Sequence, residues 1–495
     1  MRNGWQDMYV QQVLIDGQWH DSQSGDRFSV TNPADNASIA DVPDCDAKDA
    51  VLAVDAAHAA FPAWRNTLAR ERAFLLKKWH ALILENKQGL AELISVEQGK
   101  PIAESMGEVA YAAAYVEWFA EEARRSYGDV IPSPQSDRKL MVVKEPVGVV
   151  AAITPWNFPM AMLARKIAPA LAAGCTVVAK PSEETPLSAL ALARLVQRAG
   201  VPDGVVNIVT ASRARTPDVV DAWLADPRVS KISFTGSTAV GKYLARRSAE
   251  TLKKVSLELG GNAPFIVFDD ADIDAAVAGI LAAKFRNTGQ TCVSPNRILV
   301  QDGVHNAFAD KLANAVKMLK VAPATAIDAQ QGPLINARAL AKVEEHVQDA
   351  VTNGALLHAG GKRHALAELT GGHFYEPTVL SGATTAMKLA EEETFGPVAA
   401  LFRFTTEAEA VRLANATRAG LAAYFYSRDI GRIHRVADAL EVGMVGVNEG
   451  AISTEVAPFG GVKESGYGRE GSRYGLDDYQ HIKYICIGGL GTAQE

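Results

Sequence analysis

The sequence predicts an α/β protein built from two successive units, and three observations support this fold class. Short β-branched runs alternate with helical stretches from about residue 141. A second alternating block extends from about residue 272 to residue 447. Strands that alternate with helices indicate a parallel, doubly wound sheet. A chain of 495 residues is also too long for one ordinary hydrophobic core, so several packed units are expected.

The first predicted unit combines a helical layer with a parallel sheet. Residues 46–126 are rich in Ala, Leu and Glu and show helical periodicity, most clearly over 49–63 and 71–97. The expected strands are 147–153, 176–179, 205–209 and 232–234, with helices such as 188–199 between them.

The second predicted unit begins at LELGGNAP, residues 257–264, where two glycines end one strand and a proline opens the next segment. Its expected strands include 265–267, 297–300 and 399–404. Its first helix is expected to present an apolar face made of Ile273, Val277, Ile280, Leu281 and Phe285. Because no long linker separates the two units, they should pack tightly, and their junction is a natural place for a ligand cleft.

Composition and charge exclude several classes of protein. The formal net charge is -7 with both signs spread along the chain, so neither nucleic acid nor an anionic membrane is an expected partner. The first residues lack a secretion-signal pattern, which predicts a cytoplasmic protein. The four cysteines lie far apart, without a CxxC pair or suitably spaced histidines, so neither a disulfide framework nor a metal site is expected.

A turn that could bind phosphate follows the predicted strand 229–234. The segment TGSTAVGK places Gly236 and Gly241 at a turn that opens a helix, where free backbone N–H groups can receive a phosphate. It fits the GxxxxGK part of a P-loop, but Tyr243 follows where that motif needs a Ser or Thr hydroxyl for magnesium. These residues alone leave a nucleotide site and a plain tight turn as alternatives.

The segment KPSEETP lies at the carboxyl end of the strand 176–179, where parallel sheets bind ligands. Lys180 and Glu183 are therefore candidate ligand residues, and the Glu183 carboxylate could accept both hydroxyls of a ribose. The alternative is that Ser182, Glu183 and Glu184 merely cap the helix that follows.

Three polar residues in separate segments suit acyl-transfer chemistry. Cys292, in FRNTGQTCVS, lies in a glycine-containing loop and could be a nucleophile or a small buried apolar residue. Glu258, at the boundary between the units, is the candidate base, with a salt-bridged strand residue as the alternative. Asn157, in TPWNFP, could direct its amide to a developing oxyanion or could be a turn asparagine between prolines.

Taken in this order, the motifs resemble those of the aldehyde dehydrogenase superfamily, from FSVTNPA at residue 28 to IKYICIGGL near the C-terminus. The resemblance implies a Rossmann-type cofactor domain, an α/β catalytic domain and a small β extension through which dimers or tetramers form. The implied ranges are 1–126 with 147–259 for the NAD(P)-binding domain, 260–470 for the catalytic domain and 127–146 with 471–495 for the oligomerisation extension.

The resemblance also implies a mechanism without a metal. The Cys292 thiolate adds to the aldehyde, Asn157 and the Cys292 backbone N–H hold the oxyanion, hydride leaves for the cofactor, and Glu258 activates the water that hydrolyses the thioester. The residues that the resemblance assigns to the cofactor are Thr154, Pro155, Trp156, Lys180, Ser182, Glu183, Gly236, Ser237, Glu393 and Phe395, the last two in EETFGPV.

The segment 448–479 is similar to the succinate-semialdehyde dehydrogenase branch, whose substrate carries a distal anion. The corresponding substrate residues here are Arg165, Arg286, Ser453 and Phe459. Two guanidinium groups suit a carboxylate, and the resemblance implies oxidation of succinate semialdehyde to succinate. Glutarate semialdehyde or a sulfonated aldehyde would satisfy the same groups, and the alternative reading is a pair of structural arginines at helix ends.

Some residues depart from the pattern of that branch. Ser294 stands where many relatives have a second cysteine, which removes a local disulfide. Ala451 replaces a usual leucine and could enlarge the pocket, and Tyr467 interrupts a familiar GLG. The carboxylate at Glu183 favours NAD, because it would repel the 2′-phosphate of NADP, although a rotated Glu183 could admit NADP.

Three other functions remain as alternatives. A P-loop phosphohydrolase is disfavoured by Tyr243. A catalytically silent family member is disfavoured because Cys292, Glu258 and Asn157 are all present. An acylating enzyme that passes the acyl group to coenzyme A is disfavoured by Glu258, because that type does not hydrolyse its thioester.

Overall fold

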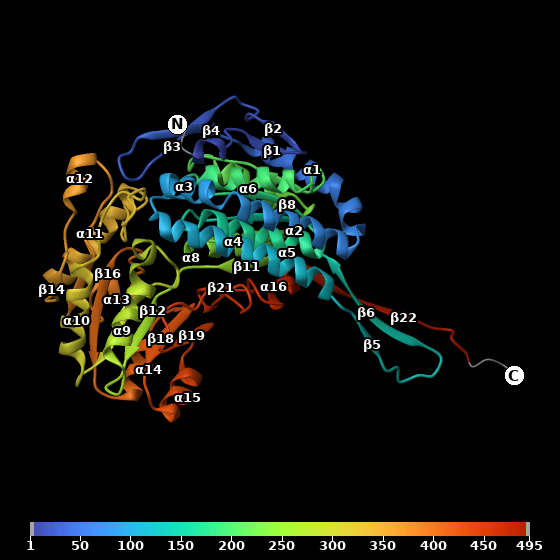
Figure 1. Cartoon of the computed structure of the whole chain (residues 1–495). Helices are drawn as coiled ribbons and strands as arrows, with labels where there is room; N and C mark the ends of the chain where they lie inside the picture. Colours follow the sequence, from blue (N-terminus) through green and yellow to red (C-terminus); the bar gives the residue numbers. More distant parts are fainter. Residues whose placement is uncertain (1–3, 492–495) are drawn as a thin grey trace.

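The computed structural model describes residues 4–491, which form two α/β units and a three-stranded sheet that projects away from both (Figure 1). The prediction of an α/β fold is confirmed. Within the described part of the chain, none of the helices combines the length and the apolar character that crossing a bilayer demands.

The first unit contains an eight-stranded sheet in the order β2-β1-β9-β8-β7-β10-β11-β21. Its central strands are parallel, and the two edges are antiparallel. The bounds are β1 (Val13–Ile15), β2 (Gln18–His20), β7 (Val149–Ile153), β8 (Thr176–Lys180), β9 (Val206–Ile208), β10 (Val229–Thr235), β11 (Lys254–Glu258) and β21 (Gly466–Tyr467).

Alternate side chains of the central strands enter two different cores, because successive strand residues point to opposite faces. Val150 and Ala152 of β7 pack against the layer of α2 to α6, whereas Val149 and Ala151 pack against α1, α7 and α8. Helices therefore cover both faces of the sheet. The helices are α1 (Ala47–Asn66), α2 (Ala69–Glu85), α3 (Lys87–Gln98), α4 (Ile102–Glu122), α5 (Pro159–Ala173), α6 (Pro186–Arg198), α7 (Thr216–Ala225) and α8 (Thr238–Ser248).

The second unit is built on a seven-stranded sheet in the order β14-β15-β16-β13-β12-β18-β19. The strands are β12 (Ala263–Val267), β13 (Pro295–Gln301), β14 (Leu356–Ala359), β15 (Thr378–Ser381), β16 (Val398–Phe404), β18 (Ala422–Tyr426) and β19 (Met444–Val447). The helices are α9 (Ile273–Ile280), α10 (His305–Lys317), α11 (Ala337–Thr352), α12 (Ala365–Thr370), α13 (Lys388–Glu391), α14 (Glu407–Asn415) and α15 (Ile430–Ala439).

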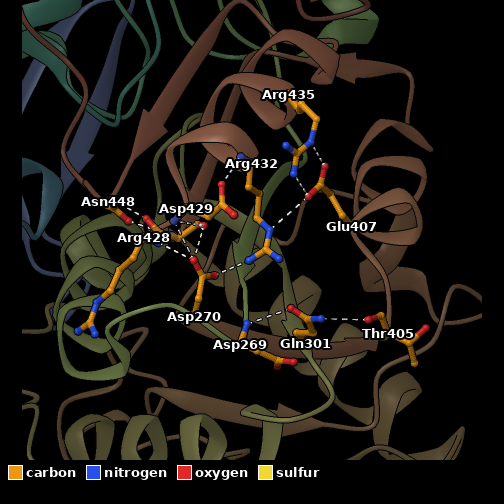
Figure 2. A network of polar contacts seen from close by, with 11 residues as sticks. Asp269, Asp270, Gln301, Thr405, Glu407, Arg428, Asp429, Arg432, Arg435 and Asn448 are labelled. Atoms are coloured by element: carbon orange, nitrogen blue, oxygen red, sulfur yellow. Dashed lines mark hydrogen bonds and ion pairs between the residues drawn. The ribbon is translucent and has the colours of Figure 1, made fainter.

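A polar network closes one end of this second sheet (Figure 2). Asp270 accepts hydrogen bonds from the Arg428 and Asp429 backbone N–H groups, both at 2.8–2.9 Å, and forms an ion pair with Arg432 at 2.5 Å. Asn448 and Ser427 exchange two hydrogen bonds of 3.0 Å between the Asn448 side chain and the Ser427 backbone. The network fixes the end of β19, from which the chain continues toward Ser453.

The first helix of the second unit differs from its prediction. Only residues 273–280 are α-helical, and a π-helical turn, Leu281–Phe285, follows. Val277, Ile280 and Phe285 are buried as expected, whereas Ile273 and Leu281 are half-buried. Gly450 approaches the Gly279 carbonyl so closely that a Cβ would lie 2.2 Å from it. π-turns occur frequently at functional sites, and this one leads directly into the loop that carries Cys292.

The chain crosses between the two units more than once. The chain enters the second sheet at β12. Later in the sequence, β21 pairs antiparallel with β11, which belongs to the first sheet. The strand β21 therefore belongs to the first sheet, although its residues fall within the predicted range 260–470. The physical reason is that Gly466 adopts φ +108° and lies against the Leu257 carbonyl, a close approach that requires glycine.

The projecting sheet has the order β22-β6-β5, with β5 (Asp129–Ile131), β6 (Lys139–Pro146) and β22 (Gln480–Ile487). The short helix α16 (Tyr474–Asp477), within the predicted extension, packs instead against α5 of the first unit. Residues 492–495, the end of that predicted extension, lie outside the described residues. The projecting sheet exposes several apolar side chains, among them Val130, Ile482 and Tyr484.

Candidate active site

Cys292 lies in a loop whose backbone has an unusual conformation. Asn287, Thr288 and Gly289 have consecutive positive φ angles of 50°, 56° and 74°, which side-chain-bearing residues rarely adopt. A Cβ on Gly289 would lie 2.1 Å from the Gly396 carbonyl oxygen, so the close approach requires glycine here. The surrounding structure must therefore hold this loop in place.

Several buried side chains supply that support. The Glu104 carboxylate accepts a hydrogen bond of 2.7 Å from the Asn287 backbone N–H. The Thr288 hydroxyl donates to the Gly332 carbonyl at 3.1 Å, and the Gly332 N–H donates back to that hydroxyl at 3.1 Å. The Gln290 side chain accepts from the Ile335 N–H at 2.9 Å. The loop is thus fixed from both units, which pre-positions the thiol.

Burial raises the pKa of the Cys292 thiol to about 12, with the neighbouring Glu393 carboxylate acting in the same direction and Arg165 in the opposite direction, which favours the thiol over the thiolate. The thiolate must therefore be produced by a base or by charge brought in with a ligand.

Asn157 follows β7 and contacts the same loop. Its side-chain Nδ2 donates a hydrogen bond of 3.0 Å to the Gln290 carbonyl, two residues before Cys292. Its own carbonyl accepts from Lys100 Nζ at 2.8 Å and from Asn287 Nδ2 at 3.0 Å. The Asn157 amide is therefore held rigidly beside the nucleophile loop and retains a second amide hydrogen for another acceptor.

Glu258 ends β11 and is 2% exposed. Neither carboxylate oxygen has a hydrogen-bond partner among the described residues. Burial, with the negative charge of Glu470, raises the pKa of Glu258 well above its usual range. The segment at Gly460 lies against it, since a Cβ there would be 2.8 Å from Glu258 Oε1. A buried carboxyl without partners is poised for proton transfer rather than for structural pairing.

Arg165 and the neighbouring Lys166 both form ion pairs with Glu470. Arg165 Nη2 lies 2.6 Å from Glu470 Oε2, and Lys166 Nζ lies 2.5 Å from Glu470 Oε1. The Arg165 guanidinium also stacks on the Phe459 ring, 4.1 Å from its centroid. Arg165 lies in the middle of α5, so it does not cap a helix end. Glu470 and Lys166 were missed in the sequence because no local motif connects residues 304 positions apart.

Cys292 and all four predicted substrate residues line one cavity of about 240 Å³. Arg286 lies 5.3 Å from the centroid of the Phe158 ring, and Lys100 Nζ lies 3.7 Å from the same centroid. Lys100 also forms a buried ion pair with Glu108. No acidic partner lies within ion-pair distance of Arg286 in residues 4–491, so its charge is available to a ligand. The predicted substrate residues in this cavity are Arg165, Arg286, Ser453 and Phe459.

One of the departing residues, Ala451, does not lie where the sequence suggested. Ala451 is exposed and is not among the residues that line the cavity, so it does not enlarge the pocket. Ser294 is buried and donates a hydrogen bond of 3.4 Å to the Lys284 carbonyl. Tyr467 lies in β21 at the sheet edge and is half-exposed.

A second pocket, of about 630 Å³, lies at the carboxyl ends of the first sheet's strands. The predicted cofactor residues that line it are Thr154, Pro155, Trp156, Lys180, Ser182, Glu183 and Gly236. The buried hydroxyls of Thr154 and Thr235, which both line this pocket, have no partner within the described residues. Unpartnered buried hydroxyls suit a polar ligand that completes their hydrogen bonds, so the residues present fit a dinucleotide.

The turn after β10 differs from its prediction in one respect. Gly236 lies in the turn, but Gly241 lies inside α8, where a Cβ would meet the Leu259 side chain at 2.3 Å. Ser237 is the N-cap of α8, and its hydroxyl accepts from the Val240 N–H at 3.4 Å. Lys242, which a P-loop would place on phosphate, forms an ion pair with Glu464 at 2.8 Å. These positions remove the basis of the phosphohydrolase alternative.

The cap predicted for α6 is also different. Thr185 is its N-cap residue and makes no side-chain cap bond. The Glu97 carboxylate, from α3, instead accepts from the Leu187 N–H at 2.5 Å and the Ser188 N–H at 3.0 Å. Ser182 and Glu183 are consequently free to line the pocket, as the ligand interpretation requires.

Glu393 lies close to Cys292, and Phe395 packs against Trp156 of the cofactor pocket. The Glu393 carboxylate accepts a 3.3 Å hydrogen bond from the Gly261 N–H, and burial raises its pKa to about 7. Glu393 lines a hollow with Gly260, Gly261 and Thr238. Phe395, at φ 54°, packs edge-on against Trp156 with ring centroids 5.6 Å apart. Glu393 thus lies near Cys292 but is not among the residues that line the substrate cavity or the second pocket.

The chain belongs to the aldehyde dehydrogenase family, since that family's model matches residues 19–485. As a member it is an NAD(P)-dependent aldehyde dehydrogenase, and it resembles the succinate-semialdehyde dehydrogenases, as predicted. It is 58% identical over 480 residues to 3-sulfolactaldehyde dehydrogenase of Pseudomonas putida, covering 97% of each chain. It is 55% identical to the NADP-dependent succinate-semialdehyde dehydrogenase GabD of Escherichia coli, covering 97% of this chain and 98% of that one.

Solved structures agree with this assignment. The succinate-semialdehyde dehydrogenase from Burkholderia pseudomallei superposes with a TM-score of 0.96 at 56% identity, covering 99% of both chains. A betaine aldehyde dehydrogenase from Staphylococcus aureus, in complex with NAD+, superposes with a TM-score of 0.95 at 36% identity, covering 99% of this chain and 97% of that chain.

Proposed function

We propose that this enzyme oxidises a small anionic aldehyde with NAD(P), and that its substrate is succinate semialdehyde, which it converts to succinate. The observation that carries the proposal is the position of Arg286. This guanidinium has no ion-pair partner in the described chain and lines the same cavity as Cys292. A guanidinium without a direct ion-pair partner can bind the anionic group of a substrate, while the Glu104 carboxylate of the same cavity interacts with it over a longer distance.

In the proposed reaction, the Cys292 thiol gives up its proton to solvent water, and the thiolate sulfur attacks the aldehyde carbon to form a thiohemiacetal. The second amide hydrogen of Asn157 and the Cys292 backbone N–H stabilise the oxyanion. Bound NAD(P) supplies the hydride acceptor, and loss of hydride leaves a thioester on Cys292.

Glu258 then acts as the base. Its carboxylate takes a proton from water, the resulting hydroxide attacks the thioester carbonyl, and the acid leaves as Cys292 is regenerated. Arg165 lowers the pKa of Glu258, whereas Glu470 raises it, so this ion-pair cluster sets how readily Glu258 holds the proton. Arg286 and Ser453 bind the distal carboxylate, with Phe459 supporting Arg165.

A sulfonated aldehyde or glutarate semialdehyde is the second candidate. Relatives named 3-sulfolactaldehyde dehydrogenase and glutarate-semialdehyde dehydrogenase are 58% and 54% identical to this chain. A sulfonate or a longer carboxylate would use the same unpaired guanidinium. We further propose that the protein works in the cytoplasm, as a dimer or tetramer formed through the projecting sheet, whose exposed apolar side chains would be covered on assembly.

Initial rates of NADH and NADPH formation test this proposal across succinate semialdehyde, glutarate semialdehyde, a sulfonated aldehyde, butanal and benzaldehyde. A strong preference in kcat/KM for succinate semialdehyde is expected. If the enzyme prefers another anionic aldehyde, the substrate is reassigned, but the proposed role of Arg286 in binding an anion remains. Highest activity with butanal would overturn the role of Arg286.

A further inference from the structure

A buried ion pair lies beside Asn157, and the reaction steps above do not use it. Lys100 follows the C-terminus of α3, and Glu108 lies in α4. Their side chains form an ion pair, and both are 0% exposed. An apolar pair of similar size often stabilises a protein equally well, so a buried ion pair is weak evidence for a purely stabilising role. The contacts of the two side chains indicate a different role.

Lys100 holds the backbone of Asn157. Its Nζ donates a hydrogen bond of 2.8 Å to the Asn157 carbonyl and lies 3.7 Å from the centroid of the Phe158 ring. The same carbonyl accepts a hydrogen bond of 3.0 Å from Asn287 Nδ2, which belongs to the loop of Cys292. The peptide unit that joins Asn157 to Phe158 is therefore held from two sides.

Glu108 holds the helix that begins beside Asn157. Phe158 is the N-cap residue of α5 and makes no side-chain cap bond. Instead, Glu108 Oε1 accepts hydrogen bonds from the backbone N–H groups of Met160 at 2.9 Å and Ala161 at 3.2 Å. Glu108 thus caps α5 from α4, because N–H groups in the first turn have no partner within their own helix. One carboxylate therefore fixes both the buried ammonium group and the start of α5.

The direction of the Asn157 side chain depends on this backbone support. One hydrogen of its amide is committed to the Gln290 carbonyl at 3.0 Å, which leaves the other for the oxyanion. A displacement of about 1 Å in a positioned group can cost about 10²-fold in rate. Lys100 is not among the residues that line the substrate cavity, so the Asn157 carbonyl is its route to the reacting atoms.

We propose that Lys100 is a positioning residue, which together with Glu108 holds Asn157 so that its second amide hydrogen points to the oxyanion of the thiohemiacetal. Lys100 therefore speeds the steps up to hydride transfer and has no part in binding the cofactor. The inference rests on the oxyanion role of Asn157 in the proposed function and adds a residue that acts through it.

A double-mutant cycle on single-turnover NADH formation tests this inference. The full-length protein, saturated with NAD, is mixed by stopped flow with succinate semialdehyde, or with whichever panel aldehyde gives the highest kcat/KM. Lys100→Met should slow NADH formation about 10- to 100-fold. In an Asn157→Ala background the same substitution should slow it less than about twofold, because the group that Lys100 positions is absent. The affinity for NAD, measured by calorimetry, should change less than about twofold.

Lys253→Met is the matched control for loss of a buried lysine. Lys253 is buried, and its Nζ donates to two backbone carbonyls, those of Asp226 at 2.6 Å and Val229 at 2.8 Å. It is not among the residues that line either the substrate cavity or the cofactor pocket. Lys253→Met should therefore keep the single-turnover rate within about twofold of the wild type, even where its Tm falls as far as that of Lys100→Met.

Lys100→Gln completes the same cycle if Lys100→Met does not fold, because it keeps a hydrogen-bond donor without the charge; its loss should be smaller and should also disappear with Asn157→Ala. Equal fold-losses in the two backgrounds would show that Lys100 acts on general packing and would overturn this inference alone. A wild-type rate in Lys100→Met would overturn it as well. A wild-type rate in Asn157→Ala would overturn the oxyanion role of Asn157 together with this inference, so the two failures are distinguishable.

Discussion

The substrate cavity and the cofactor pocket use charge in opposite ways. In the substrate cavity several charges are buried and held in fixed pairs, such as Arg165 with Glu470, whereas Arg286 has no ion pair within residues 4–491. In the cofactor pocket the charged side chains are looser, and Glu183 is 26% exposed on its side chain. The difference suggests a rigid site for the bond-making steps and an adaptable site for a cofactor that must enter and leave in each turnover.

The largest expected effect is that of Cys292→Ala. The variant should lose roughly 10⁴-fold or more in kcat with any aldehyde, because no other group can form the thioester. Its cofactor pocket should be intact, because Cys292 does not line it. Steady-state NADH formation and NAD binding by calorimetry measure the two sites separately. Substantial dehydrogenase activity in this variant would refute the covalent mechanism.

Glu258→Gln should slow kcat about 10²- to 10⁴-fold, the usual contribution of a general base. The first NADH should still form as a burst, because hydride loss precedes thioester hydrolysis. In the wild type the hydrolytic rate should rise with pH, because only the ionised carboxylate accepts a proton and burial raises the pKa of Glu258.

Stopped-flow absorbance at several pH values separates the burst from the steady state. The variant's steady-state rate should lack the rise that the wild type shows. The same rise in both proteins would mean that another group, such as Cys292 itself, controls the pH profile.

The two arginines allow a sharper comparison within the substrate cavity. Arg286→Gln should lower kcat/KM for succinate semialdehyde about 10- to 100-fold and leave butanal nearly unchanged, because this guanidinium is bound to no protein carboxylate. Arg165→Gln should impair both aldehydes, because it also removes a charge that lowers the pKa of Glu258. The specificity constants of both variants with both aldehydes check this. Equal losses for both aldehydes in Arg286→Gln would show that Arg286 is structural.

The same comparison explains how much the sequence could predict. The cofactor pocket is built from short contiguous segments at strand ends, so the local pattern could place KPSE at the carboxyl end of a strand, whereas the cofactor roles of KPSE and TPW come from the family resemblance. The parallel sheets and most strand ranges follow from the same local alternation. Backbone geometry at one strand end depends mainly on neighbouring residues, which is why these predictions succeed.

The substrate cavity is assembled from residues that are distant in the chain. Glu470 pairs with Arg165 and Lys166, and Glu104 holds the loop at Asn287, yet no spacing in the sequence connects these residues. The π-helical turn before Cys292 was likewise unpredicted, because its apolar residues keep a helical period. Interactions across long sequence separations are tertiary packing effects and leave no local pattern.

The smallest expected effect concerns Glu97 of α3, whose carboxyl group accepts hydrogen bonds at the N-terminus of α6 in the cofactor-binding unit. Burial raises its pKa to about 8, above the value of about 4.3 expected for an unfolded chain. Between these values the unfolded chain releases a proton that the folded protein retains. The stabilisation from protonated Glu97 is therefore fully present below a pH of about 4, and it decreases as the pH rises to about 8.

In Glu97→Gln this contribution is absent, so the variant's Tm should fall less steeply than that of the wild type between pH 5 and pH 8. The difference should be about 2 °C or more, since one kcal/mol shifts Tm by about that much in a large domain. Differential scanning calorimetry at matched scan rates measures it, and equal slopes would show that Glu97 stays ionised in the folded protein, held by its backbone hydrogen bonds at Leu187 and Ser188.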